Sequence, residues 1–214
     1  MTEKEKMLSG GLYNHYDTEL TNDRACIAEK LALYNQLKDD EEKKCMLGDM
    51  LSKIGANVEI KTPFMCDYGY NIEVGSNVFV NYNCTILDCN KVVIGNNVLI
   101  APNVQIYSAT HPTDYKIRLH ELEMAYPITI EDNVWIGGNA VICAGVTIGD
   151  CCVIGAGSVV TKDIPAWTVA AGNPCKVIRK ITEEDRKYYF RNWEFDEDAW
   201  NQIKDKKVNI APEE

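Results

Sequence analysis

Aliphatic residues recur every six positions through much of the chain. From residue 130 onward, each six-residue unit opens with Ile or Val, at Ile130, Ile136, Ile142, Ile148, Ile154 and Val160. Earlier units of the same kind open at Val74, Val80, Ile86, Ile94, Ile100 and Ile106. A fixed internal period is typical of solenoids, whose repeats stack because no single repeat can bury its own apolar face.

The six-residue period predicts a mainly β fold in which three short strands make one triangular coil. One aliphatic residue per unit points inward, and Gly or Asn allows the tight turns between strands. Residues 56–73 are expected to add part of a first coil. A β-sandwich of alternating strands is the competing interpretation, but an unbroken period of six over residues 130–165 disfavours it.

The repeat is interrupted twice. The step from Ile86 to Ile94 is eight residues, which predicts a bulge near Cys89–Lys91. The 24 residues between Ile106 and Ile130 lack the pattern and predict a long loop over residues 107–129. Long loops within a compact array are often functional.

Helical patterns flank the repeat. Thr21 is predicted to cap an amphipathic helix whose apolar face carries Ile27, Leu31 and Tyr34. A second helix is expected over residues 41–55, and a third is expected to begin at Thr182. Residues 208–214 are expected to be frayed. The predicted organisation is therefore a helical segment over residues 1–55, the repeat domain over 56–181, and a C-terminal helix and tail over 182–214.

Composition and charge exclude several classes of protein. Apolar residues make up 46% and charged residues 25%, as in ordinary globular chains. No apolar stretch is long enough to span a membrane, and the charged N-terminus lacks a signal-peptide core, so we expect a cytoplasmic protein. The net charge of −10 disfavours general nucleic-acid binding, which needs clustered Lys and Arg.

The nine cysteines show no metal-ligand spacing. Their number is odd, no C-x-x-C occurs, and Cys151 and Cys152 are adjacent in the sequence. We therefore expect free, buried, reduced thiols and no metal site.

His111 is one of three histidines, with His15 and His120, and it lies in the loop that interrupts the repeat. Histidine is the side chain best suited to proton transfer near neutral pH. A loop histidine by itself is more often an ordinary surface residue, so this position alone does not define a catalytic site.

Eight sequence segments together carry a resemblance to a known family. They are EKEKMLSGGLYNHYDTEL at 3–20, CDYGYNI at 66–72, VNYNCTILD at 80–88, IGNNVLIAPNV at 94–104, ATHP at 109–112, PITIEDNVWIGG at 127–138, GVTIGDCCVIGAGSVVTKDIP at 145–165 and AAGNPCKVIRKI at 170–181. The chain resembles the hexapeptide-repeat acyltransferases of the maltose/galactoside O-acetyltransferase type. The resemblance implies a left-handed parallel β-helix, acetyl-CoA as donor, a sugar hydroxyl as acceptor, and His111 as the general base.

The resemblance also implies a donor site. Thr161, Lys162, Lys176 and Arg179 match positions that hold the nucleotide phosphates, and Trp135 matches a tryptophan beside the cofactor. Residues 161–191 carry a net charge of +3 in an otherwise acidic chain, which suits a strongly anionic donor. The small residues Gly138, Gly155 and Ala156 would let the pantetheine arm approach the backbone.

The expected acceptor-binding residues are Asp67, Asn81 and Asp88, since carboxylates and amides form paired hydrogen bonds with sugar hydroxyls. His15 and Cys89 stand where galactoside enzymes of this family have acids that contact the acceptor. The CDYGYN motif favours an acceptor of the maltose/glucose type. A galactoside or an oligosaccharide of the nodulation type remains the alternative.

We expect a homotrimer with active sites between subunits, as the resemblance implies and as closed cyclic symmetry favours. The acceptor pocket is expected to combine Asp67 and Asn81 of one subunit with His111 of the next. Two alternatives from other classes are a non-catalytic scaffold and a three-histidine zinc enzyme that hydrates carbon dioxide. The nine-residue step between His111 and His120 disfavours the zinc enzyme.

Overall fold

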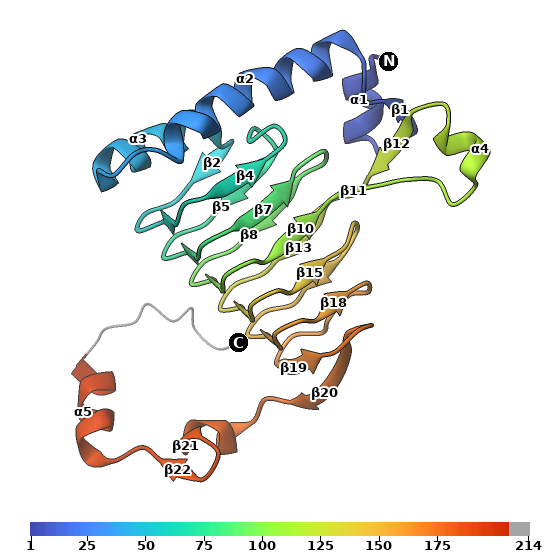
Figure 1. Cartoon of the computed structure of the whole chain (residues 1–214). Coiled ribbons are helices and arrows are strands. Elements are labelled where there is room, and N and C mark those ends of the chain that lie inside the picture. Colours follow the sequence, from blue (N-terminus) through green and yellow to red (C-terminus); the bar gives the residue numbers. More distant parts are fainter. Residues whose placement is uncertain (206–214) are drawn as a thin grey trace. The chain divides into compact units, whose positions relative to one another are not determined.

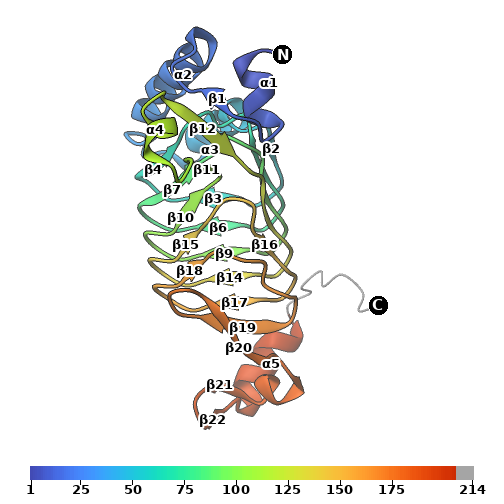
Figure 2. The same ribbon diagram turned by 90° about the vertical axis from the view of Figure 1, so that its right-hand side faces the viewer.

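The computed structural model describes residues 1–205, and parallel strands between Lys53 and Ala171 form a β-solenoid with three sheets. The first sheet contains β2 (Lys53–Ile54), β5 (Ile72–Val74), β8 (Val92–Ile94), β13 (Ile128–Ile130) and β16 (Thr147–Ile148). The second contains β3 (Glu59–Ile60), β6 (Phe79–Val80), β9 (Leu99–Ile100), β14 (Trp135–Ile136), β17 (Val153–Ile154) and β19 (Thr168–Ala171). The third contains β4 (Phe64–Cys66), β7 (Cys84–Leu87), β10 (Gln105–Tyr107), β15 (Val141–Ile142) and β18 (Val159–Val160). Figure 2 shows the second sheet as a ladder of short strands.

The core confirms the six-residue period. Every Ile or Val that opens a unit is buried, and equivalent residues pair from coil to coil, as in Ile86, Ile106, Ile142 and Val160 of the third sheet. The first coil is complete rather than partial, because Leu51 is already extended and the N–H of Ser52 donates to the carbonyl of Ile72. The helix expected over 41–55 therefore ends earlier, at Met50, and the strands begin at Lys53.

One corner of the solenoid carries a ladder of asparagines. Asn57, Asn77, Asn97 and Asn133 all have positive φ, between 55° and 60°, a conformation that asparagine tolerates better than most residues. Each of the first three donates a side-chain hydrogen bond of 3.0 Å to the next asparagine, and Asn133 donates to Asp150. The polar turns of successive coils are thus tied together along the axis.

Helices close the N-terminal end of the solenoid (Figure 1). They are α1 (Glu3–Leu8), α2 (Thr18–Tyr34) and α3 (Asp40–Met50), with β1 (Tyr13–Asn14) between the first two. Ile27, Leu31 and Tyr34 are buried as predicted. The predicted start of α2 is wrong by about one turn, because Asp17, not Thr21, caps it by accepting from the N–H of Glu19.

Asn35 takes the place of a neighbouring strand at the open edge of β4. Its side-chain oxygen accepts from the N–H of Phe64 at 2.8 Å, and its amide donates to the carbonyl of Phe64 at 2.9 Å. Both polar groups of a buried edge residue are thereby satisfied, which is one way in which proteins protect sheet edges.

The expected loop over 107–129 is a folded excursion. It contains β11 (Ala109–Thr110), α4 (Tyr115–Arg118) and β12 (Leu122–Ala125). β12 pairs antiparallel with β11 on one side and with β1 on the other, so the N-terminal segment and the excursion share one small sheet. The buried Asn90 holds this arrangement, since its side chain donates to the carbonyls of Met7, Leu8 and Ala125.

The chain divides into one unit over Met1–Lys180 and a second over Ile181–Glu214. The first ends with β20 (Lys176–Lys180), which pairs antiparallel with β19. In the second, the helix predicted from Thr182 is only a 3-10 turn, Glu183–Arg186, because the aromatic residues after it form the hairpin β21 (Tyr188–Phe190) and β22 (Trp193–Glu194). The helix α5 (Glu197–Asp205) follows the hairpin. The expected frayed segment, 208–214, lies outside the described residues.

The structure also bears on membrane-spanning helices and on the cysteines. No helix within residues 1–205 is both long and apolar enough to cross a membrane. The cysteines are free thiols, but Cys26 and Cys45 are exposed rather than buried, since they lie on the outer faces of α2 and α3.

Candidate active site

His111 directly follows β11, at the point where the excursion leaves the solenoid. Its side chain is 54% exposed, and its Nε2 atom lies 3.7 Å from the Oε1 atom of Glu123. The two residues face each other because β11 and β12 pair with Thr110 opposite Met124. An accessible imidazole beside a carboxylate is an arrangement that can accept and hold a proton.

Glu123 contacts three other residues of this site, and the sequence does not predict its role. Its side chain is 16% exposed, its Oε2 atom accepts from the Tyr13 hydroxyl at 2.8 Å, and its Oε1 atom lies 3.3 Å from Nδ1 of His15. Nδ1 of His15 also lies 3.0 Å from the carbonyl of Glu121. Nothing in the sequence relates an acid to a histidine twelve positions earlier. Their contact becomes evident only from the pairing of β12 with β11.

Asp67 and Cys89 extend the cluster toward the solenoid. The buried thiol of Cys89 donates to Oδ2 of Asp67 at 3.4 Å. Burial raises the pKa of the Asp67 carboxyl and nearby Glu123 adds to this, whereas Cys89 and Arg24 oppose it. Burial, with Asp67 close by, also raises the pKa of the Cys89 thiol, so the thiol remains a donor near neutral pH. We call Tyr13, His15, Asp67, Cys89, His111 and Glu123 the His111 cluster.

Asp88 does not fit the predicted contact with an acceptor. Its side chain is fully buried, and its oxygens accept from the backbone N–H groups of Asp67, Tyr68 and Asn71 at 3.0, 2.8 and 3.2 Å. Burial raises the pKa of Asp88 to about 7, and these backbone bonds act in the opposite direction. Asp88 instead fixes the turn that presents Asp67.

The predicted acceptor residues lie at two different borders of the third sheet. We call the side where its strands end the exit border. Asp67, Cys143 and Thr161 directly follow strands there, and Tyr107 is the last residue of β10. The entry border lies where the chain passes from the second sheet to the third, at residues 81–83, 101–103, 137–139 and 155–157.

Asn81 lies at the entry border, whereas Asp67 and His111 belong to one cluster at the exit border of the same chain. Within this chain Asp67 therefore lies with His111 and not with Asn81, which differs from the expected grouping of Asp67 with Asn81. The strands of the third sheet separate Asn81 from Asp67, and the excursion folds back onto its own N-terminal segment.

The predicted donor residues also fall into two groups. Trp135 is 52% exposed on the outer face of the second sheet, in a row that continues through Val153 and Val169 to Arg179. Lys176 is exposed on β20, opposite Ala171. Gly138, Gly155 and Ala156 line the adjacent entry border. A Cβ atom at Gly155 would lie 2.8 Å from that of Ala171, so coil packing itself requires a small residue there.

Thr161 and Lys162 are exposed at the exit border, below the base of the excursion. β10 and β18 are two strand steps apart in the third sheet. At about 4.8 Å per step, Thr161 lies roughly 10 Å along the axis from Tyr107, where the excursion begins. The His111 cluster and the first pair of predicted phosphate ligands thus share one border.

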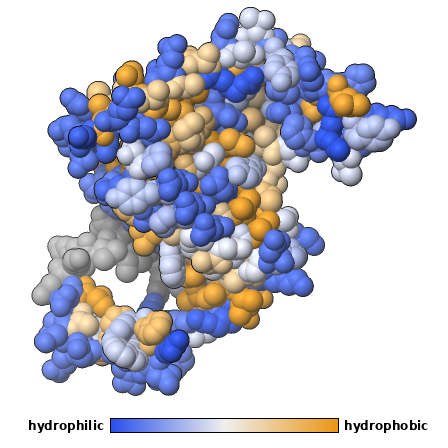
Figure 3. Space-filling model, in the orientation of Figure 1, coloured by the Kyte–Doolittle hydropathy of each residue, from blue (hydrophilic) through white to orange (hydrophobic). Residues whose placement is uncertain are grey.

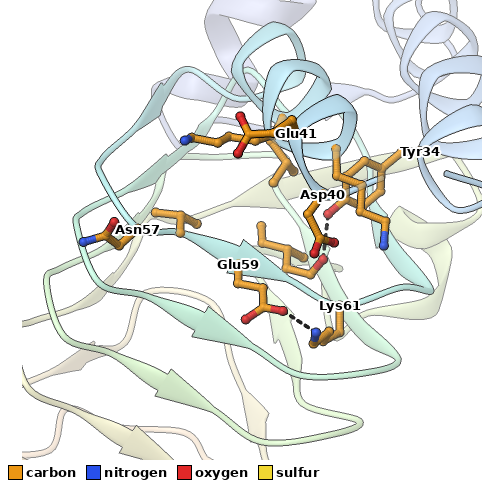
Figure 4. A pocket seen from close by; sticks show the side chains of 11 residues that line it. Tyr34, Asp40, Glu41, Asn57, Glu59 and Lys61 are labelled. Atoms are coloured by element: carbon orange, nitrogen blue, oxygen red, sulfur yellow. Dashed lines mark hydrogen bonds and ion pairs between the residues drawn. The ribbon is translucent and has the colours of Figure 1, made fainter. Parts of the chain in front are cut away.

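A separate hollow of about 380 Å³ lies between α3 and β3 (Figure 4). Asp40, Lys43, Asn57, Glu59 and Lys61 are among its lining residues, and Tyr34 closes it by donating to the carbonyl of Ile60 at 2.7 Å. It includes no predicted site residue. No group of three His, Cys, Asp or Glu side chains in the described part of the chain is placed to hold a metal ion.

Two family models match the chain. The model described as Bacterial transferase hexapeptide (six repeats) matches residues 127–162, and the Maltose acetyltransferase hexapeptide capping motif matches residues 6–55. The first match covers the most regular coils, and the second covers the N-terminal helices that close the solenoid.

Relatives match over most of the chain. A putative acetyltransferase of Saccharomyces cerevisiae is 53% identical over 184 residues, covering 85% of this chain and 94% of that protein. The galactoside O-acetyltransferase of Escherichia coli is 48% identical over 153 residues, covering 72% of this chain and 75% of its own.

Solved structures of acetyltransferases are also similar to this chain. A maltose O-acetyltransferase from Clostridium difficile is 51% identical, with a TM-score of 0.84, and covers 86% of this chain and 99% of its own. A galactoside acetyltransferase in complex with coenzyme A is 39% identical, with a TM-score of 0.88, and covers 92% of this chain and 99% of its own. The chain is therefore an acetyltransferase that belongs to the hexapeptide-repeat family of the maltose and galactoside O-acetyltransferases.

Proposed function

We propose that the protein transfers the acetyl group of acetyl-CoA to a hydroxyl group of a sugar, with His111 as the general base. The observation that carries this proposal is the contact between the exposed His111 and the largely buried Glu123, at 3.7 Å. The galactoside acetyltransferase with coenzyme A and the maltose O-acetyltransferase named above supply the donor and the acceptor class.

In the proposed reaction the sugar oxygen attacks the thioester carbonyl while His111 takes the hydroxyl proton. The C–S bond then breaks, and the imidazolium returns its proton to the departing CoA thiolate. An alcohol is a weak nucleophile until its proton is removed, so the base acts where the barrier is highest. Glu123 would orient the imidazole and stabilise its charged form, as buried carboxylates do in other acid–base pairs.

We propose an acceptor of the maltose/glucose type, contacted by Asp67. Nδ1 of His15 faces Glu121 and Glu123, and the Cys89 thiol bonds to Asp67, so neither residue presents a carboxylate to the acceptor. Because Glu123 is engaged by Tyr13 and the two histidines, Asp67 is the acidic side chain of the cluster that we propose for binding hydroxyls. A galactoside acceptor, which the resemblance associates with acids at positions 15 and 89, fits less well.

We propose that acetyl-CoA lies along the later coils. Lys162 and Thr161 at the exit border, with Lys176 and Arg179 on β20, would bind its phosphates, since anionic groups need such local positive charge. Trp135 would lie beside the cofactor, and Gly138, Gly155 and Ala156 would admit the pantetheine arm at the entry border. Because these groups occupy opposite borders of the third sheet, a continuous binding groove would need two chains.

We propose a homotrimer in which the exit border of one subunit faces the entry border of the next. Leu99 and Trp135 are both about half exposed on the outer face of the second sheet. Apolar surface also gathers over the last coils, between β15 and β20 (Figure 3). Exposed apolar patches of this kind mark interfaces between chains. Each site would then join His111 and Asp67 of one subunit with Asn81 of its neighbour.

The reaction is tested by measuring thiol release from acetyl-CoA with maltose, glucose, a galactoside and a chitin-type oligosaccharide. We expect the highest kcat/KM with maltose or glucose, and a loss of about 10²–10⁴-fold in kcat for His111→Ala. Wild-type turnover of His111→Ala at saturating substrates would remove His111 as the base. A preference for the galactoside or the oligosaccharide would change the acceptor but leave the chemistry in place.

The shared site is tested by co-refolding inactive His111→Ala chains with inactive Asn81→Ala chains. Hybrid trimers should regain activity, because one kind of interface pairs an intact His111 with an intact Asn81. Mixtures of His111→Ala with Asp67→Ala should stay inactive, since both residues come from the same chain at each site. A monomer in light scattering would contradict the shared site. So would hybrids of His111→Ala with Asn81→Ala that have no activity.

A further inference from the structure

Tyr13 and Glu123 are directly opposed residues in the antiparallel pair of β1 and β12, although 110 positions separate them in the chain. Side chains of directly opposed residues project from the same face of a sheet and interact. Tyr13 is fully buried, and its hydroxyl donates to Oε2 of Glu123 at 2.8 Å. The N-terminal segment thus reaches the side chain that contacts His111.

We propose that Tyr13 is a positioning residue for catalysis: its hydroxyl fixes the Glu123 carboxylate in the orientation that holds His111. This inference rests on the proposed role of His111 as base. It assigns a function in the reaction to β1, the short strand between the first two N-terminal helices.

The two carboxylate oxygens of Glu123 have different partners. Oε2 bonds to Tyr13, while Oε1 faces both imidazoles, at 3.3 Å from His15 and 3.7 Å from His111. The terminal torsion of a glutamate is broad and soft, so the carboxylate plane is not set by the side chain itself. The bond at Oε2 restricts that rotation and keeps Oε1 directed toward His111.

The surroundings of Tyr13 keep it in place as a donor. Its ring packs in a small apolar cluster with Met7, Leu20, Tyr68 and Ala125. Burial, with Cys89 and Glu123 nearby, raises the pKa of the Tyr13 hydroxyl far above its usual range, so the proton stays on oxygen throughout the working pH range. A donor that never ionises gives Glu123 a constant hydrogen bond.

The chain offers a matched control for this hydroxyl. Tyr34 is also fully buried and its hydroxyl also makes one hydrogen bond, of 2.7 Å, but to the backbone of Ile60. Tyr13→Phe and Tyr34→Phe each remove one oxygen atom and one hydrogen bond that a buried tyrosine donates. Tyr13→Phe also removes the hydroxyl beside Cys89. They should reduce stability by similar amounts, whereas only Tyr13→Phe alters the contact with Glu123.

The test is steady-state kinetics with acetyl-CoA and the best acceptor, below the melting temperature of each variant. We expect Tyr13→Phe to lower kcat about tenfold while leaving the KM for acetyl-CoA unchanged, and Tyr34→Phe to leave both constants unchanged. In a Glu123→Gln background, Tyr13→Phe should cause almost no further loss, because both changes break one interaction. Tyr13→Met, which also lacks the hydroxyl, is the second variant if the Phe variant does not fold.

Wild-type kcat in Tyr13→Phe, an equal loss in Tyr34→Phe, or losses that multiply in the double variant would overturn the inference. His111→Ala separates this result from the proposed function. An inactive His111→Ala with a fully active Tyr13→Phe would refute only the positioning role, whereas an active His111→Ala would refute the base on which it rests.

Discussion

Nε2 of His111 and Oε1 of Glu123 lie 3.7 Å apart, at the base of an excursion that leaves the repeat and returns to it. The pairing of β11 with β12 creates this contact, and the pairing of β12 with β1 adds Tyr13 and His15 to it. The candidate catalytic group is therefore assembled from the non-repetitive parts of the chain. The coils provide its support.

Glu123→Gln should lower kcat about 10- to 100-fold, because a hydrogen bond to a charged group is typically worth about 1.5–3 kcal/mol. The KM for acetyl-CoA should hardly change, since Glu123 is not among the residues expected to bind the cofactor. Glu121→Gln is the matched control: it makes the same charge change two positions away, where only the backbone carbonyl contacts His15. Equal kinetics for both variants would argue against a role for the Glu123 carboxylate.

Lys162→Ala and Arg179→Ala should each raise the KM for acetyl-CoA by more than they change kcat. Phosphate contacts at these positions would stabilise ground state and transition state alike, so their loss weakens binding without slowing bound substrate. Saturation curves at low and high salt provide the measurement, and the effect should shrink as salt rises. Lys53→Ala, an exposed lysine of the first coil, should behave as the wild type. Unaltered curves for both variants would move the phosphate site elsewhere.

Asp88→Asn should lower the free energy of unfolding. The difference in this free energy between the variant and the wild type should become smaller as pH rises. Burial raises the pKa of Asp88 from 3.8 to about 7, so between these values the folded state binds more protons than the unfolded state. Wild-type stability gained from this group is therefore complete below pH 3.8 and is lost as pH rises through 7. The asparagine does not titrate, but it cannot accept from all three N–H groups.

Urea unfolding at pH 5, 6, 7 and 8, at one fixed protein concentration, measures this difference. Asp49→Asn, at an exposed position of α3, should show a pH dependence close to that of the wild type. If the difference between the wild type and Asp88→Asn stayed constant or widened with pH, the assigned direction of the Asp88 pKa would be wrong.

Asn35→Ala should lower the free energy of unfolding by about 1–3 kcal/mol, because it leaves a buried backbone N–H and a carbonyl of Phe64 without partners. Activity per folded molecule should be retained, since Asn35 belongs to the cap and not to the His111 cluster. Gln36→Ala removes an amide from the adjacent exposed position and should have little effect. Urea midpoints with unchanged slopes would establish the comparison.

The sequence alone predicts the solenoid because its strongest signal is local. A residue such as Ile142 or Ile154 faces inward wherever six-residue units stack, so the core and the coil order follow from the period. Amphipathic spacing likewise identifies the buried face of α2. The pattern does not fix the start of α2, because Asp17 and Thr21 are both good capping residues and only packing decides between them.

The arrangement of the site could not be predicted in the same way. The period does not say which border of a sheet a turn residue occupies, so Asn81 and Asp67 were expected together although a sheet separates them. Nor does it reveal that β1 inserts beside β12, which is what makes Glu123 a neighbour of His15 and His111. Asp88 differs from the expectation for a related reason: a carboxylate after a strand can face solvent or accept from the backbone of the neighbouring turn, and Asp88 does the second.

The registered stacking of the third sheet sets the length of the donor that the proposed site can accept. Each coil between β10 and β18 advances the exit border by one strand spacing, about 4.8 Å, and no side-chain substitution can alter that increment. The distance from the base of the excursion to Thr161 is therefore a whole number of strand spacings. A chain that gained or lost one coil in this interval would suit a donor of different length, even if every residue of the His111 cluster stayed the same.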